Sequence, residues 1–209
     1  MTEQEVVERL GRARVVPVAK LDDGDQAEAT ARALQRGGID CIEVTFRTAG
    51  AGEALRAART VPGMLVGAGT VLSPEQAADA ADAGADFAVA PGTNPAVVAA
   101  CAELGLPFFP GVATPSEIET ARALGRTTLK LFPAEQTGGP GFIRAVSATY
   151  PDVRFMPTGG IGRANAAEYL ALPSVLAVGG SWLVKPDLLH DAHLLIATFR
   201  LAHALGILP

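Results

Sequence analysis

The sequence is poor in features that would indicate a secreted, membrane or nucleic-acid-binding protein. Two cysteines in 209 residues are too few for a disulfide framework, so we expect a reduced cytoplasmic protein. Seventeen Lys and Arg against 22 Asp and Glu give a formal net charge of −5, with no long run of either sign. Neither nucleic acid nor an anionic membrane is therefore an expected partner. No apolar stretch approaches the roughly 18 residues that a membrane-spanning helix needs.

Signatures of metal and cofactor chemistry are also missing. The three histidines, His190, His193 and His203, all lie near the end of the chain, and we expect them on the surface rather than at a metal. The segment "GAGTVL" lacks the full dinucleotide-binding pattern, and the sequence has no P-loop and no nucleophile elbow. Residues 1–16 are charged and amphipathic, which predicts a helix rather than a signal peptide. We expect neither metal nor cofactor.

Apolar residues, in contrast, are abundant and occur in eight short runs. Hydrophobic residues make up 49% of the chain and aromatics 5%, which is enough apolar material for one domain over residues 1–209. Both cysteines, Cys41 and Cys101, fit this core as small buried residues. The runs are 15–19, 41–46, 65–71, 87–91, 107–112, 128–133, 154–160 and 175–180.

The spacing of these runs predicts a barrel. Their starts are about 20 to 26 residues apart, which leaves room for a strand, a short helix and two loops. The intervening segments carry helix signals: "SPEQAADAADAGA" and "TPSEIETARALG" each begin with a hydroxyl cap and a proline. Eight such units predict a short (β/α)8 barrel preceded by an N-terminal helix. A doubly wound open sheet is the alternative, but it more commonly has five or six strands.

In such a barrel the active site lies where the strands end, and polar residues interrupt the predicted strands there. Because side chains alternate along a strand, Glu43, Thr45 and Arg47 share one face. Thr70 lies at the end of the third run, in "GAGT". Lys130 lies inside the apolar run "TLKLFP", where a charge is unusual.

Two interpretations of Lys130 are open on chemistry alone. Burial disfavours an ammonium ion, so a buried lysine can present a neutral amine that attacks a carbonyl and forms a Schiff base. Alternatively, Lys130 pairs with Glu43 for stability or extends to water from the strand end. The other two lysines, Lys20 and Lys185, are expected to be solvated.

Glycine pairs follow the last two predicted strands, in "PTGG" and "VGGS". Barrels often bind phosphate after strands seven and eight, so Gly159, Gly160, Gly180 and Ser181 are candidate phosphate donors. Tight turns without a ligand are the alternative, and the two pairs at the two expected positions favour phosphate.

Taken in order, these motifs resemble one family. "IEVTFRT", "VGAGTVLSPEQ", "AVAPGTNP", "PFFPGVATPSE", "LKLFPAE", "RFMPTGGI" and "VLAVGGSWLV" are similar to those of the bacterial 2-keto-3-deoxy-6-phosphogluconate (KDPG) aldolases, which also cleave 4-hydroxy-2-oxoglutarate (KHG). The resemblance covers about residues 6–205. It implies a metal-free class I aldolase of the Entner–Doudoroff pathway that acts on a phosphorylated 2-keto acid and assembles as a homotrimer.

The resemblance also implies roles for individual residues. Lys130 of "LKLFPAE" corresponds to the Schiff-base lysine, and Glu43 of "IEVTFRT" to the general acid and base. Arg47 and Thr70 match positions that hold the pyruvyl carboxylate. In relatives the loop after the first strand is often longer than "VAKLDDGD", so this loop is where the chain departs most from the pattern.

Further positions correspond to the distal part of the substrate. Gly159, Gly160 and Ser181 match the phosphate site, and Phe132 lies beside the substrate in such enzymes. Thr158 is expected to help distinguish carboxylate from phosphate tails.

Three other functions stay open. Cleavage of the galactonate epimer, KDPGal, is usually accompanied by Asn in place of Arg47, so this chain resembles the gluconate type. A phosphosugar isomerase or epimerase would not need Lys130. A non-catalytic barrel would bind a phosphorylated ligand without releasing pyruvate.

Overall fold

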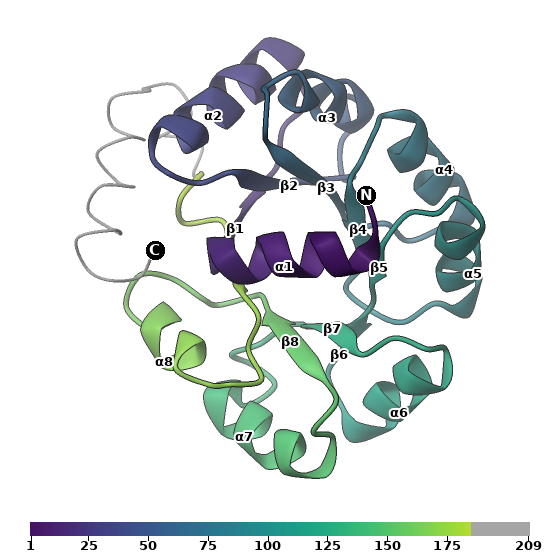
Figure 1. The fold of residues 1–209 in the computed structure, drawn as a ribbon, viewed down its shortest axis with the longest axis vertical. Helices are drawn as coiled ribbons and strands as arrows, with labels where there is room; N and C mark the ends of the chain where they lie inside the picture. Colours follow the sequence, from purple (N-terminus) through teal and green to yellow (C-terminus); the bar gives the residue numbers. More distant parts are fainter. Residues whose placement is uncertain (185–209) are drawn as a thin grey trace.

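A ring of parallel strands forms the centre of this computed structural model, which describes residues 1–184 (Figure 1). Lys185, His190, His193 and His203 lie outside the described residues. The strands are β1 (Val15–Ala19), β2 (Cys41–Thr45), β3 (Leu65–Gly69), β4 (Phe87–Val89), β5 (Phe108–Phe109), β6 (Gly111–Val112), β7 (Thr128–Leu131), β8 (Arg154–Pro157) and β9 (Val178–Gly180).

The strands follow one another around the ring in chain order. One sheet has the order β5-β4-β3-β2-β1-β9 and the other β6-β7-β8, and every pairing is parallel. Parallel bridges from Phe155 to Val175 and from Thr158 to Gly179 join β8 to the segment that contains β9. The predicted (β/α)8 barrel is therefore confirmed.

The fifth predicted strand differs in detail from the expectation. The run 107–112 is split at Pro110 into β5 and β6, which pair with different neighbours. Proline has no N–H to donate to a ladder, which favours a break at this position. Its carbonyl is still used, because it accepts a hydrogen bond of 2.9 Å from the Lys130 amide. The two short strands together occupy one place in the barrel.

Several strands end before the apolar runs do. The run 65–71 leaves strand geometry after Gly69, because Thr70 has a left-handed φ of 59°. The run 154–160 leaves it after Pro157, and Gly159 and Gly160 have φ values of 102° and 78°. The ends of these runs are therefore turns at the carboxyl end of the barrel.

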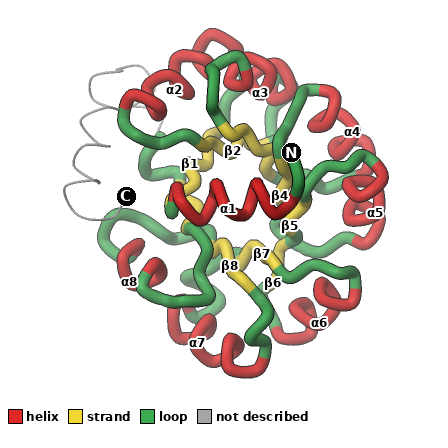
Figure 2. Tube along the Cα trace, in the orientation of Figure 1, coloured by secondary structure: helices red, strands yellow, loops and turns green. Residues whose placement is uncertain are grey.

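Helices surround the ring of strands (Figure 2). The predicted caps of α4 and α6 are confirmed: Ser73 accepts a hydrogen bond from the Gln76 amide, and Thr114 forms a capping box with Glu117. The helices are α1 (Glu3–Ala13), α2 (Gly24–Arg36), α3 (Ala51–Arg59), α4 (Pro74–Asp82), α5 (Pro95–Glu103), α6 (Pro115–Ala123), α7 (Gly139–Thr149) and α8 (Ala166–Leu170).

The predicted N-terminal helix closes one end of the barrel. Helix α1 crosses the opening of the ring in Figure 1, and β1 begins two residues after α1 ends. Its side chains Val6 and Leu10 are fully buried, and Glu3 forms an ion pair of 2.8 Å with Arg126. Helix α1 therefore covers the amino-terminal end of the barrel, and a ligand can approach from the carboxyl end.

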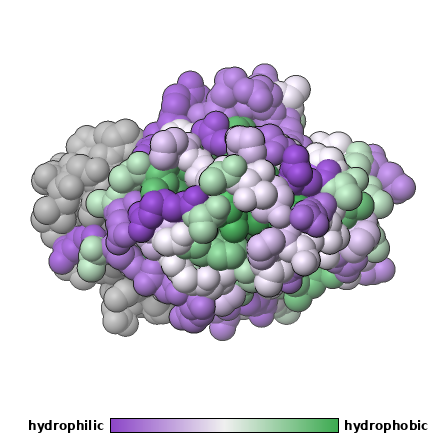
Figure 3. Space-filling model, turned by 90° about the horizontal axis from the view of Figure 1, so that it is seen from below, coloured by the Kyte–Doolittle hydropathy of each residue, from purple (hydrophilic) through white to green (hydrophobic). Residues whose placement is uncertain are grey.

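Apolar side chains fill the space between strands and helices. Phe87 and Phe109 are fully buried, with ring centroids 5.9 Å apart. The two cysteines are buried as predicted, and burial raises the pKa of both thiols, that of Cys101 to about 11. Polar and neutral residues surround smaller hydrophobic areas on the face shown in Figure 3. No helix within residues 1–184 is both long and apolar enough to cross a membrane.

Candidate active site

Lys130 and Glu43 form an ion pair inside the barrel. Lys130 Nζ lies 3.2 Å from Glu43 Oε1 and 3.5 Å from Oε2. The side chains are only 7% and 2% exposed. Strand β7 supplies the lysine and β2 the glutamate, and both side chains point into the ring because alternate strand residues face inward. The predicted meeting of these two residues in the interior is confirmed.

A glycine on the neighbouring strand makes room for Glu43. In β3, Gly67 is the register partner of Glu43 and gives space to the Phe87 ring, whereas Gly69 faces the Glu43 side chain. A Cβ atom at Gly69 would lie 2.8 Å from the carboxyl carbon of Glu43, closer than real Cβ contacts come. The packing role of Gly69 was missed at the sequence level, because "VGAGT" shows small residues without showing which side chain needs the space.

The ion pair lines a small cavity that opens toward the carboxyl end of the barrel. This cavity, called the inner cavity below, has a volume of about 220 Å³, enough for a small keto acid. Val18 and Pro91 also line it, although their sequence motifs give no sign of this. The lining residues are Val18, Glu43, Thr45, Arg47, Thr70, Pro91, Lys130, Phe132 and Thr158.

The polar residues that border the inner cavity beside the ion pair differ in exposure: Thr45 is buried, Thr70 is half-buried and Arg47 is exposed. The Thr45 hydroxyl accepts a hydrogen bond of 3.4 Å from Nε of Arg47. Thr70 holds a left-handed φ of 59°, a conformation that costs energy for a β-branched residue. Such strain is common at functional sites, and here it accompanies a side chain that borders the inner cavity.

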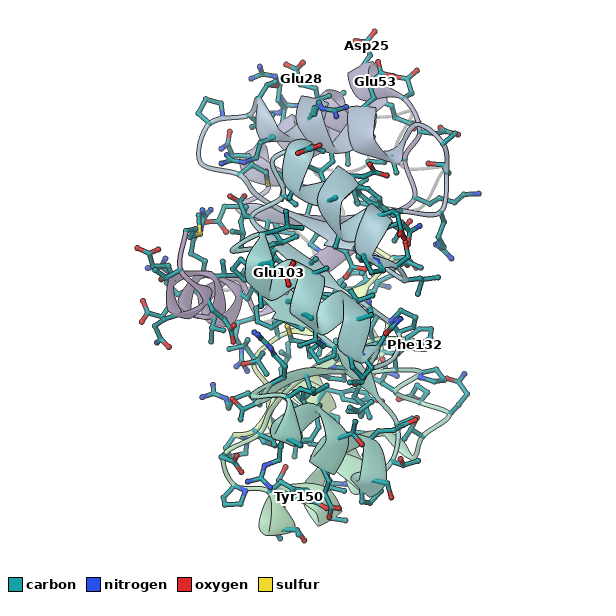
Figure 4. All side chains as sticks on the ribbon, turned by 90° about the vertical axis from the view of Figure 1, so that its right-hand side faces the viewer. Asp25, Glu28, Glu53, Glu103, Phe132 and Tyr150 are labelled. Carbon is teal, nitrogen blue, oxygen red and sulfur yellow. The ribbon has the colours of Figure 1, made fainter. Side chains whose placement is uncertain are left out.

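Phe132 borders the same cavity from the end of β7. Its ring centroid lies 5.9 Å from Lys130 Nζ, and the residue is 36% exposed. Figure 4 shows Phe132 at the opposite end of the barrel from α1, which is the end where the strands terminate. The aromatic ring therefore covers part of the entrance to the ion pair.

A second cavity lies next to the first. This outer cavity has a volume of about 280 Å³ and shares Val18, Arg47, Phe132 and Thr158 with the inner cavity. All four predicted phosphate donors border it. Its lining residues are Val18, Lys20, Arg47, Phe132, Thr158, Gly159, Gly160, Ile161, Gly179, Gly180, Ser181 and Val184.

The charges of the outer cavity have one sign. Within the described residues, Lys20 and Arg47 are its charged lining residues, and no carboxylate borders it. Lys20 is exposed, as predicted, but its place at a cavity was not foreseen. Cations and glycine backbone together suit an anionic ligand.

Backbone hydrogen bonds from residues 134 and 135, which follow β7, stabilise the turn at residues 158–160. The Ala134 amide donates to the Thr158 carbonyl at 2.9 Å, and the Glu135 amide donates to the Gly159 carbonyl at 3.2 Å. A Cβ atom at Gly160 would lie 2.7 Å from Glu135 Cβ, so only glycine fits there without displacement.

A buried hydrogen bond fixes Glu135 in turn. Its carboxylate accepts from the hydroxyl of Tyr169, a fully buried residue of α8. Burial, and next this carboxylate, raise the pKa of Tyr169. Neither residue was selected from the sequence, where "PAE" and "EYL" give no sign that they meet.

The combined geometry is suited to amine chemistry on an anionic carbonyl compound. An amine and a carboxylate lie at the base of the inner cavity, hydroxyls and a guanidinium lie at its rim, and a cationic glycine-rich cavity adjoins it. Among residues 1–184, no group of three His, Cys, Asp or Glu side chains is arranged to hold a metal ion.

Comparison with known proteins gives the family. Residues 6–196 match the family model of KDPG and KHG aldolases. The chain is 52% identical over 180 residues to the 2-dehydro-3-deoxy-phosphogluconate aldolase of Treponema pallidum, covering 86% of each chain. It is 46% identical over 176 residues to the KHG/KDPG aldolase of Escherichia coli, covering 84% of this chain and 83% of the relative.

One of the similar solved structures contains a covalent reaction intermediate. The KDPG aldolase of Legionella pneumophila, with pyruvate captured as a covalent carbinolamine, superimposes with a TM-score of 0.88 at 39% identity. The match covers 94% of this chain and 96% of that one. The chain belongs to the KDPG and KHG aldolase family.

Proposed function

We propose that the chain is a class I aldolase that cleaves KDPG to pyruvate and glyceraldehyde 3-phosphate, and KHG to pyruvate and glyoxylate. The observation that carries this proposal is the buried Lys130–Glu43 pair at the base of the inner cavity. The names of the Treponema and Escherichia relatives and the pyruvate carbinolamine of the Legionella enzyme support it.

Lys130 begins the reaction as a nucleophile. Glu43 lies close enough to take a proton from the lysine ammonium, which leaves a neutral amine. The amine adds to the C2 ketone of the substrate and forms a carbinolamine. Glu43 then returns its proton to the leaving hydroxyl, so that loss of water gives a protonated imine and restores the Glu43 carboxylate. The imine nitrogen is then the electron sink for carbon–carbon cleavage.

Glu43 transfers protons in the later steps. As its carboxylate takes the proton of the C4 hydroxyl, the C3–C4 bond breaks, the aldehyde leaves and the bonding electrons form an enamine. The protonated Glu43 then supports protonation of the enamine carbon, and hydrolysis of the resulting imine frees pyruvate and Lys130. One carboxyl group serves both steps because the first step protonates it for the second.

The two cavities receive the two ends of the substrate. Arg47 offers a planar donor pair to the carboxylate next to the ketone, and Thr70 adds a hydroxyl. Phe132 packs beside the carbon chain, and Thr158 borders both cavities, where it meets the substrate between its two anionic ends.

The phosphate lies in the outer cavity, where Gly159, Gly160 and Gly180 offer backbone N–H groups and Ser181 a hydroxyl. Arg47 also supports KDPG over its galactonate epimer, since the epimer's aldolases usually carry Asn at the corresponding position.

A substrate panel tests this proposal. Pyruvate release from KDPG, KDPGal and KHG is measured by coupling to lactate dehydrogenase, with and without a chelator. We expect the largest kcat/KM for KDPG and no effect of the chelator. A chelator-sensitive enzyme would contradict imine chemistry, and binding of KDPG without pyruvate release would favour a non-catalytic barrel. Interconversion of phosphosugars that persists without Lys130 would favour an isomerase.

We further propose that residues 1–209 act as one domain within a cytoplasmic homotrimer. The family resemblance supports the trimer, and two buried, reduced cysteines agree with a reducing compartment. Light scattering after size exclusion should give a mass three times that of the 21.4 kDa chain. A mass equal to one chain would contradict the trimer.

A further inference from the structure

Charge is divided unequally between the two cavities. The inner cavity contains Lys130, Glu43 and Arg47, whereas the outer cavity contains Arg47 and Lys20. Arg47 belongs to both, so its loss would affect both ends of a substrate. Lys20 is the charged residue that borders the outer cavity and not the inner one among the residues described.

The pairing of β1 with β9 brings Lys20 close to Ser181, one of the predicted phosphate donors. Pro17 of β1 pairs with Gly180 of β9, and the two strands are parallel, so both end at the carboxyl end of the barrel. Lys20 follows the end of β1, and Ser181 follows the end of β9, so the two residues leave neighbouring strands at the same rim. The salt bridges within residues 1–184 do not involve Lys20, and its side chain is exposed.

These observations assign a specific task to an amine at this position. Glycine N–H groups can orient a phosphate, but they carry no net charge to balance a dianion. A lysine ammonium is a compact charge on a flexible stem, suited to a phosphate whose position is set by other groups. An exposed lysine at a cavity rim also attracts the anion over a distance of about one Debye length.

We propose that Lys20 is the residue that selects phosphorylated over unphosphorylated 2-keto acids. This inference rests on the proposed aldolase function and adds a residue that neither the sequence motifs nor the family comparison assign. Lys20 acts on the distal phosphate alone, so it stabilises binding of the phosphorylated substrate and takes no part in imine formation.

The test compares two substrates that differ by the phosphate alone, KDPG and 2-keto-3-deoxygluconate. In Lys20→Met we expect KM for KDPG to rise about tenfold, because charged hydrogen bonds at partly exposed sites contribute modestly. The value of kcat for KDPG and kcat/KM for the unphosphorylated sugar acid should stay within about twofold of wild type. Lys20→Arg should restore most of the affinity for KDPG, and high salt should reduce the difference between Lys20→Met and wild type.

A matched control removes one positive charge elsewhere. Arg36 is exposed in the last turn of α2, at the opposite end of the barrel, and no ion pair within residues 1–184 involves it. Arg36→Met should leave KM for both substrates unchanged. Inorganic phosphate provides a measurement that needs no turnover of the unphosphorylated substrate: it should compete with KDPG in wild type and bind about tenfold more weakly to Lys20→Met.

The outcomes separate this inference from the function on which it rests. Lys20 does not select phosphate if Lys20→Met leaves KM for KDPG and inhibition by phosphate unchanged. The same follows if Lys20→Met raises KM for KDPG and for 2-keto-3-deoxygluconate equally. The aldolase function is tested separately by pyruvate release in wild type. If wild type releases no pyruvate from KDPG, the function fails, whereas pyruvate release in wild type together with an unchanged KM for KDPG in Lys20→Met overturns the role of Lys20 alone.

Discussion

The inner and outer cavities adjoin one another but are built in different ways. The inner cavity depends on side chains fixed on strands, with the ion pair of Lys130 and Glu43 almost fully buried. The outer cavity depends on turns, with glycines in left-handed conformations and an exposed lysine. Under the proposed function, bond cleavage takes place where buried side chains are fixed on strands, and phosphate is recognised where backbone turns meet solvent.

The two constructions also respond differently to mutation. Removing one partner of the buried ion pair leaves a charge without water or counterion. Both the free energy of unfolding and the catalytic rate should therefore fall. Removing one group of the outer cavity leaves several other donors and solvent in place. A phosphorylated and an unphosphorylated substrate therefore distinguish a change in one cavity from a change in the other.

The largest effect is expected at Lys130. Lys130→Arg keeps a positive charge opposite Glu43 but cannot form an imine, so activity toward both substrates should fall by at least about 10⁴-fold. Lys130→Ala should be equally inactive and should also lose about 3–5 kcal/mol in the free energy of unfolding, because it leaves Glu43 unpaired. Pyruvate release and urea denaturation measure these effects. Substantial activity in Lys130→Arg would show that the lysine serves only to pair with Glu43.

The next effect concerns the glycine beside the glutamate. Gly69→Ala places a methyl group against the Glu43 carboxyl group and displaces it from Lys130. We expect kcat to fall about 10²-fold or more on both substrates, in the range of lost general acid–base catalysis. Glu43→Gln should slow proton transfer similarly while still permitting imine formation.

Gly141→Ala is the control for Gly69→Ala, because a Cβ atom at residue 141 meets nothing within 4 Å. It should leave kcat unchanged. Wild-type turnover in Glu43→Gln would remove Glu43 from the mechanism, and wild-type turnover in Gly69→Ala would show that the methyl group does not displace the carboxyl group.

A change in the outer cavity should affect one substrate only. Gly160→Ala requires a left-handed φ of 78° and conflicts with Glu135, so the turn that borders the outer cavity must move. We expect KM for KDPG to rise about tenfold, which corresponds to losing one charged hydrogen bond of about 1.4 kcal/mol, and KM for 2-keto-3-deoxygluconate to change little.

Gly162→Ala, two residues away, has free space around its Cβ position and should behave as wild type. Equal losses on both substrates in Gly160→Ala would show that the two cavities are not separable.

A smaller effect is expected from the support beneath that turn. Tyr169→Phe keeps the buried ring and removes the hydrogen bond to Glu135. The free energy of unfolding should fall by about 1 kcal/mol, the net value of one such bond, as measured by urea denaturation. Activity toward the unphosphorylated substrate should not change, and a loss there would extend the role of Tyr169 to the inner cavity.

The smallest effect is expected from the cysteines, which border neither cavity. Burial raises the pKa of the Cys101 thiol to about 11 and that of Cys41 as well, so near pH 8 both stay protonated and unreactive. Alkylating reagents should therefore label neither thiol in the native protein and should leave both activities intact. Labelling should appear once urea unfolds the chain. Rapid labelling of the native protein with loss of activity would contradict this placement.

Local sequence patterns predicted the eightfold barrel, the helix caps and the meeting of Lys130 with Glu43. They succeeded because strand alternation and caps depend on near neighbours in the chain. The split at Pro110 was missed although proline favours a break there, because its neighbours on either side pair with different strands. The left-handed Thr70 was missed because the sequence does not show the turn in which it lies. The position of Lys20 at the outer cavity, and the contact of Gly69 with Glu43, depend on strand register, which the sequence does not display.

Borohydride reduction in the presence of pyruvate tests the central claim most directly. Reduction converts an imine into a stable secondary amine, which peptide mass mapping can locate. The account predicts one pyruvyl adduct per chain, on Lys130, with none on Lys20 and none in Lys130→Arg. An adduct at another lysine, or no adduct in an enzyme that still cleaves KDPG, would contradict it.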